Sequence, residues 1–93
     1  MQIFWNDHVL AESEDVLVVG TECYVPEECV DMALLQKNTA VAYCSDKGYG
    51  ECYDIVLPAG SLSSGAWRYP HPYTPMIALK GRIGFKRTML RET

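Results

Sequence analysis

Residues 39–57, TAVAYCSDKGYGECYDIVL, carry the clearest structural signal of the chain. Residues 39–44 are β-branched, small or aromatic, a composition that favours a strand. Residues 45–48, Ser-Asp-Lys-Gly, have the composition of a turn. Residues 49–57 then alternate, with Tyr, Glu, Tyr, Ile and Leu on one side, which predicts a second strand. The sequence therefore predicts an antiparallel hairpin, the strongest in the chain.

The register of this hairpin decides which side chains meet. A four-residue turn pairs Cys44 with Tyr49, so that Cys44 and Cys52 point to opposite faces and cannot form a disulfide. The same register puts Tyr53 on the face of Cys44. A one-residue bulge at Gly48 is the alternative, and it would change these pairings.

Further short strands are expected outside this hairpin, each rich in β-branched or aromatic residues. They cover residues 3–5, 8–12, 16–19, 23–25, 66–69 and, as the last strand, 82–86. Asn6-Asp7 is the tight turn of the first hairpin. Pro26 begins a single helical turn, and a second helical turn spans residues 75–80. Residues 58–65, rich in Pro, Gly and Ser, are expected to form a loop.

In total, the sequence predicts about seven or eight short strands with one or two helical turns. It predicts a mainly β fold in one small domain, residues 1–93, built as a curled sheet or small barrel filled by aromatic side chains. A chain of 93 residues has room for one core and one modest site.

The composition is that of a globular protein, with 48% hydrophobic and 22% charged residues. We expect a cytoplasmic protein with no membrane partner, since no signal peptide or bilayer-spanning run is recognised. The first 36 residues carry eight acidic side chains and no Lys or Arg, whereas residues 80–93 carry five basic side chains. We expect these ends to lie near each other and offset each other, or to form a solvated surface; the alternative is that the basic end meets an anion such as a phosphate. The net charge of −4 argues against nucleic acid as a partner.

Four cysteines lie at positions 23, 29, 44 and 52. Their gaps do not match the closely paired cysteines of structural zinc sites. We therefore expect no metal and no cofactor. In a reducing compartment the thiols are expected to stay free, and Cys23, Cys29 and Cys52 to be small buried hydrophobes.

Cys44 and Lys47 are the first candidates for chemistry. A lysine three residues after a cysteine can lower the pKa of the thiol, and a thiolate is a usable nucleophile. Burial pushes the same pKa upward, so the protonation state of Cys44 stays open at this point. A structural cysteine before an ordinary Lys-Gly turn is the alternative interpretation.

Trp67 and Tyr69 are the second candidates. They share one face of a predicted strand, and the rigid Pro-His-Pro at residues 70–72 ends it. Such an aromatic pair can wall a pocket for a ring or a cation, and Tyr24 and Tyr53 can extend the wall. Aromatic packing in the core is the structural alternative.

The order of these segments resembles that of a known family. The shared elements are Trp5, Leu10-Ala11-Glu12-Ser13, Tyr24-Val25-Pro26, Cys44-x-x-Lys47-Gly48 with Tyr53, Trp67-x-Tyr69-Pro70-x-Pro72 and Ile83-Gly84-Phe85. On these elements the chain resembles, over essentially its whole length, the family of unknown function numbered 427. Some classifications file that family under a nucleotidyltransferase-like name.

The resemblance implies an all-β, tent-like fold, similar to that of methionine sulfoxide reductase B and of a zinc-binding guanine-nucleotide release chaperone. The candidates for ligand binding then comprise Glu12, Tyr24, Tyr53, Trp67 and Tyr69. The zinc-binding cysteine pairs of those relatives are missing here. Ser45 and Asp46 replace the Pro and the aromatic residue usual between the Cys and the Lys. No paired carboxylates for Mg²⁺ and no phosphate loop support nucleotidyl transfer.

Three functions follow as hypotheses. The preferred one is binding of a small ligand, anionic or cyclic, in an aromatic pocket near Cys44, Tyr53, Trp67 and Tyr69. The second is a thiol-dependent enzyme that uses Cys44 activated by Lys47. The third is a structural or protein-interaction domain, in which the charged ends set the pairing of a homodimer.

Overall fold

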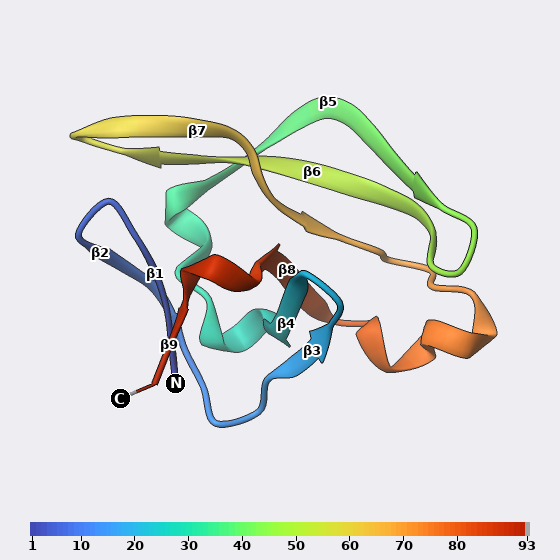
Figure 1. The fold of residues 1–93 in the computed structure, drawn as a ribbon. Helices are drawn as coiled ribbons and strands as arrows, with labels where there is room; N and C mark the ends of the chain where they lie inside the picture. The colour runs from blue at the N-terminus through green and yellow to red at the C-terminus, as the bar shows by residue number, and fades with distance from the viewer. Residues whose placement is uncertain (93) are drawn as a thin grey trace.

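Nine strands in two antiparallel sheets carry the fold of residues 1–92, the part of the chain that this computed structural model describes (Figure 1). The smaller sheet has the order β2-β1-β9 and the larger one the order β3-β4-β8-β7-β6-β5. The mainly β prediction is confirmed. The larger sheet ends at β3 and β5, so the described residues form no closed barrel. The strands are β1 (Gln2–Trp5), β2 (His8–Glu12), β3 (Leu17–Val19), β4 (Glu22–Pro26), β5 (Leu35–Cys44), β6 (Gly48–Leu57), β7 (Gly60–Arg68), β8 (Arg82–Lys86) and β9 (Leu90–Arg91).

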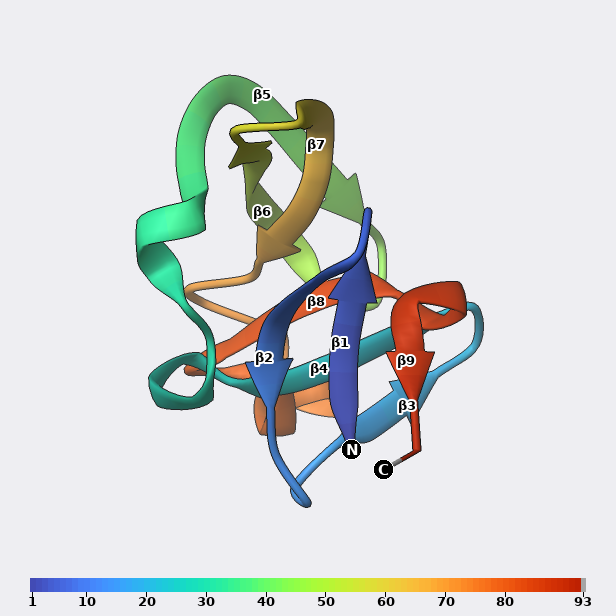
Figure 2. The same cartoon turned by 90° about the vertical axis from the view of Figure 1, so that its left-hand side faces the viewer.

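The first hairpin, β1 with β2, forms as predicted around Asn6 and Asp7. Both turn residues have positive φ, 51° and 61°, which a tight two-residue hairpin turn favours. On its other side β1 pairs with β9, where Gln2 lies opposite Arg91. Figure 2 shows β1 between β2 and β9. The strand at residues 82–86 is therefore present but is not the last one.

The charges of the two ends meet, as the sequence analysis expects. Arg82 Nη2, in the basic C-terminal part, lies 2.8 Å from Asp15 Oδ1, in the acidic N-terminal part. The amino group of Met1 also lies 3.2 Å from Glu14 Oε1. These pairs hold the loop before β3 against its neighbours.

The helical parts within residues 1–92 are four short 3-10 turns. They are η1 (Glu27–Cys29), η2 (Met32–Leu34), η3 (Thr74–Leu79) and η4 (Arg87–Met89). η1 directly follows Pro26, and η3 ends before Gly81, as the sequence predicts. In the described part of the chain, no helix has the length and apolar character needed to cross a membrane.

The β5–β6 hairpin is present, but its predicted register is wrong by one residue. Cys44 pairs with Gly48 rather than with Tyr49. The reason is Gly48, whose φ of 94° lets a loop of three residues close the hairpin. Cys44 therefore shares its face of the sheet with Gly48 and Cys52, and Tyr53 lies on the opposite face. Both cysteines are nevertheless free.

Residues 58–65 do not form the predicted loop, because β7 begins at Gly60. Pro58 and Ala59 alone connect β6 with β7, and Ile55 of β6 pairs with Leu62. The Gly- and Ser-rich composition of residues 60–65 is typical of a loop, so the sequence does not predict this part of the strand. The neighbouring strand β6 stabilises it, because the Asp54 carboxylate accepts a hydrogen bond from the Ser64 N–H at 2.9 Å.

The two faces of the larger sheet carry two different cores. The face toward the smaller sheet holds the main core, whose fully covered side chains include Ile3, Leu10, Ile55, Ile83 and Phe85. On the other face, Tyr24, Tyr69 and Leu79 form a second cluster with Trp67 and Met76 packed against it. This second face carries the candidate site.

Candidate functional site

Cys44 ends β5 at the mouth of the three-residue loop, and its side chain is partly exposed. The backbone N–H groups of Asp46 and Lys47 are close enough to its Sγ to favour the thiolate, and the Lys47 N–H donates a hydrogen bond to the Cys44 carbonyl at 3.2 Å. The Lys47 Nζ lies 3.6 Å from the same sulfur atom. The two backbone donors, and after them the ammonium charge, hold the pKa of Cys44 below its usual value. The thiol is therefore set up to ionise.

Lys47 lies between Cys44 and Glu22. Its Nζ is 3.9 Å from Glu22 Oε1, and its side chain is only 14% exposed. A cation covered to this extent requires anionic neighbours. The loop backbone is also held, because the Lys47 carbonyl accepts a hydrogen bond from the Tyr73 N–H at 3.2 Å. The ammonium group is thus fixed beside the sulfur rather than free to swing into solvent.

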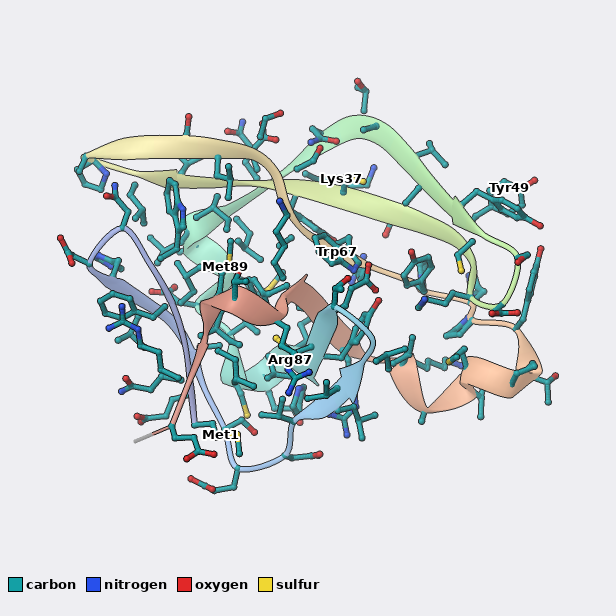
Figure 3. All side chains as sticks on the ribbon, in the orientation of Figure 1. Met1, Lys37, Tyr49, Trp67, Arg87 and Met89 are labelled. Carbon is teal, nitrogen blue, oxygen red and sulfur yellow. The ribbon has the colours of Figure 1, made fainter. Side chains whose placement is uncertain are left out.

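A chain of hydrogen bonds continues from Glu22 into the sheet. The Tyr24 hydroxyl donates to Glu22 Oε1, and Trp67 Nε1 donates to the Tyr24 hydroxyl oxygen at 3.1 Å. Burial, and then the hydrogen bond to Glu22, raise the pKa of Tyr24 far above its usual range. Tyr24 therefore keeps its proton and remains a donor. Figure 3 shows Trp67 between β7 and the strands β4 and β8.

Gly84 makes the contact between Tyr24 and Trp67 possible. These two residues lie on the strands on either side of β8, and both pair with Gly84. A Cβ at position 84 would lie 2.6 Å from Tyr24 Cε2 and closer still to Trp67 Nε1. Only a residue without a side chain lets the indole and the phenol meet across the strand.

Tyr69 covers the site from the side of β6. Its side chain is 6% exposed, and its ring lies directly on Gly50. Burial, with the nearby charges of Glu22 and Cys44, raises the pKa of Tyr69. A neutral phenol therefore lies close to the groups that carry charge.

The structure brings five of the seven sequence-predicted site residues to one place. These five are Tyr24, Cys44, Lys47, Trp67 and Tyr69. Glu12 lies apart, on β2 of the smaller sheet, where it accepts a hydrogen bond from Gln2. Tyr53 also lies apart, because it points into the main core, with the Arg68 guanidinium 5.8 Å from its ring centre.

Glu22 is the main site residue that the sequence analysis does not identify. It is one of eight acidic residues in the first 36, and their charge is that of an ordinary solvated surface. The one local signal is its position two residues before Tyr24, which puts both side chains on the same face of a strand. Gly84 is likewise signalled only by the family resemblance, because its role depends on β4 and β7.

The other cysteines contrast with Cys44. Cys23 is fully buried, its thiol donates to the Phe85 carbonyl at 3.7 Å, and burial raises its pKa to about 11. Cys52 is buried too, whereas Cys29 is partly exposed and not the buried hydrophobe expected. Within residues 1–92, no group of three or more His, Cys, Asp or Glu side chains is placed to hold a metal ion.

Comparison with known proteins identifies a family. No curated protein matches this chain. A family model described as a domain of unknown function (DUF427), with a short name that refers to a nucleotidyltransferase, matches residues 1–93. Since the match covers the whole chain, the protein belongs to the DUF427 family.

Proposed function

We propose that this protein is a thiol-dependent enzyme in which Cys44 is the nucleophile. The observation that carries the proposal is the environment of the Cys44 sulfur. It is partly exposed, lies 3.6 Å from Lys47 Nζ, and has a pKa that the nearby backbone N–H groups of Asp46 and Lys47 lower further. Partial exposure and electropositive neighbours are typical of reactive thiolates, whereas a structural cysteine has no need of them.

Each neighbour of Cys44 has a role in this proposal. Lys47 stabilises the thiolate before attack, and Glu22 holds the ammonium group in place at 3.9 Å. Tyr24 and Trp67 are positioning residues, because they fix Glu22 through hydrogen bonds and do not touch the sulfur. The thiolate would attack an electrophilic carbon or sulfur atom of a small substrate, and the group displaced from that atom would leave with the electron pair of the broken bond.

The experiment is the pH dependence of iodoacetamide labelling, resolved by peptide mass spectrometry for each cysteine. We expect Cys44 to label fastest, with an inflection below the ordinary thiol value of about 8.5. In Lys47→Ala the inflection should move upward without reaching the ordinary value, because the backbone N–H groups of Asp46 and Lys47 remain.

Two other cysteines provide the controls. Cys23 is fully buried and should label only when the protein unfolds. Cys29 is partly exposed, so its labelling rate shows how fast an exposed cysteine without these neighbours reacts. If Cys44 labels no faster than Cys29, or with an inflection at or above about 8.5, the nucleophile proposal is wrong.

Binding of a small ligand by the aromatic residues of the same site is the second candidate. The observation in its favour is that Trp67 stays partly exposed while Tyr24 and Tyr69 beside it are buried. A screen of small anionic and cyclic metabolites by tryptophan fluorescence tests it. Saturable binding that Trp67→Ala abolishes without unfolding the protein, together with slow labelling of Cys44, would favour this function over the enzyme.

A further inference from the structure

A second place on the molecule, separate from the Cys44 sulfur, has the form of a ligand pocket. It has a volume of about 530 Å³ and lies between β5, the first part of β6 and the segment that follows β7. The lining residues that bear on its chemistry are Lys37, Val41, Tyr49, Glu51, His71 and Tyr73. The candidate site residues Cys44, Lys47, Tyr24 and Trp67 do not line it.

An irregularity in β5 creates the pocket. Lys37 pairs with Tyr53, but Val41 pairs with Glu51, so β5 has two more residues than β6 over the same stretch. The extra residues lift the edge strand away from β6, as the arch of β5 in Figure 1 shows.

Asn38 fixes the shape of this arch. Its side-chain Nδ2 donates to Asp54 Oδ1 at 2.8 Å, and its Oδ1 accepts from the Ala40 N–H at 2.8 Å. The pocket is therefore built by specific hydrogen bonds, and it needs no ligand to form.

Two exposed aromatic side chains, Tyr49 and Tyr73, line the pocket. Tyr49 is 66% exposed and packs against Tyr43 with ring centres 4.8 Å apart. Tyr73 is 41% exposed, yet it is held firmly, with its ring on Gly48 and its N–H on the Lys47 carbonyl. Two ordered phenol rings at one pocket are the usual surface for a flat ring.

The pocket also contains the Lys37 ammonium group, which can leave Glu51 for the negative group of a ligand. Lys37 Nζ lies 3.7 Å from Glu51 Oε2, and its side chain is 56% exposed, so this ion pair is loose. Glu51 has a better partner in Arg68, whose Nε donates to Oε1 at 2.9 Å. If Lys37 moves to a ligand anion, Glu51 keeps Arg68 and is not left unpaired. Figure 3 shows Lys37 and Tyr49 on the β5–β6 side of the molecule.

We propose that this pocket binds a small aromatic anion, with its ring on Tyr49 and Tyr73 and its negative group on Lys37. Neither a neutral ring nor an aromatic cation uses both features. The inference does not depend on the chemistry of Cys44, since the two sites share no charged side chain.

The test uses naphthalene-2-sulfonate as the probe and ¹H–¹⁵N NMR spectra of the uniformly labelled protein as the readout. Amide shifts should change with saturation and cluster at residues 37–41 and 49–51 and at His71 and Tyr73. Lys37→Gln should weaken binding about three- to fivefold, the usual effect of a partly exposed ion pair. Tyr73→Ala should weaken it at least as much.

Three controls make the test decisive. Lys80→Gln, at an exposed lysine outside the pocket, and Cys44→Ser should bind the probe as the wild type does. Naphthalene-2-methanol, which lacks the charge, should bind more weakly than the sulfonate. The proposal is overturned if the shifts fall elsewhere, if no binding occurs at millimolar concentration, or if Lys37→Gln binds as tightly as the wild type.

Discussion

At the scale of single residues, Gly84 is the position on which the site depends most strictly. The Tyr24 and Trp67 rings meet across it, and a Cβ there would overlap both of them. We predict that Gly84→Ala destabilises the protein by about 1–3 kcal/mol, the usual cost of overpacking. Urea denaturation measures this loss.

The same substitution should break the hydrogen bond from Trp67 to Tyr24. In a Trp5→Phe background, where Trp67 is the only tryptophan, Gly84→Ala should change the emission maximum. Gly81→Ala is the matched control, because nothing lies within 4 Å of a Cβ there and only its φ of 78° opposes alanine. Equal spectra for the two variants would contradict the role given to Gly84.

Residue separation explains which site residues the sequence could identify. Cys44 and Lys47 lie three residues apart around a turn, so their proximity follows from local structure alone. Glu22 reaches Lys47 only because β4, β8 and β7 pair in one particular register. No pattern within a single strand contains that information.

At the scale of elements, the irregular pairing of β6 with β7 depends on Asp54. Its carboxylate accepts from the Ser64 N–H and from Asn38, and these bonds hold its pKa below the usual value. A carboxyl with a lower pKa in the folded state stabilises folding above its unfolded pKa of about 3.9. That stabilisation is lost as the pH falls through the folded pKa.

We therefore predict a shallower acid dependence of stability in Asp54→Ala than in the wild type between about pH 5 and 2. The measurement is the urea midpoint at each pH, and Asn38→Ala, which removes one donor, should fall between the two. Ser61→Ala, on the exposed outer part of β7, should follow the wild type. Parallel pH curves for Asp54→Ala and the wild type would show that Asp54 does not hold this pairing.

Elements also show where sequence analysis fails. The β1–β2 hairpin and β8 follow from composition and turn chemistry, and both are confirmed. The first half of β7 is Gly- and Ser-rich, and it is a strand only because β6 offers a pairing edge and Asp54 binds its backbone. The β5–β6 register depends on the positive φ of Gly48, and the sequence alone does not show that Gly48 adopts it.

At the scale of the whole molecule, the main core contains side chains of both sheets, and Phe85 is one of its largest members. This side chain is fully buried on β8, in a cluster that includes Ile3 from β1. We predict that Phe85→Ala costs about 3–5 kcal/mol. A chain of this size has a total stability on the order of 5–14 kcal/mol, so much of it would be lost.

Circular dichroism during urea denaturation measures this effect. Val18→Ala, at a 47% exposed position on the edge strand β3, is the matched control and should change stability by about 0.5 kcal/mol or less. A loss below about 1 kcal/mol for Phe85→Ala would mean that the two sheets are held together elsewhere.

The proposed chemistry depends on a Cys44 thiol whose pKa in the folded protein lies below that of an ordinary thiol. The most direct measurement is the thiolate absorbance at 240 nm against pH, taken as the difference between the wild type and Cys44→Ser. Because the backbone donors and Lys47 lower the pKa of Cys44, the inflection should fall below about 8.5, and Lys47→Ala should move it upward. An inflection at or above that value, or one that Lys47→Ala leaves in place, would contradict the account.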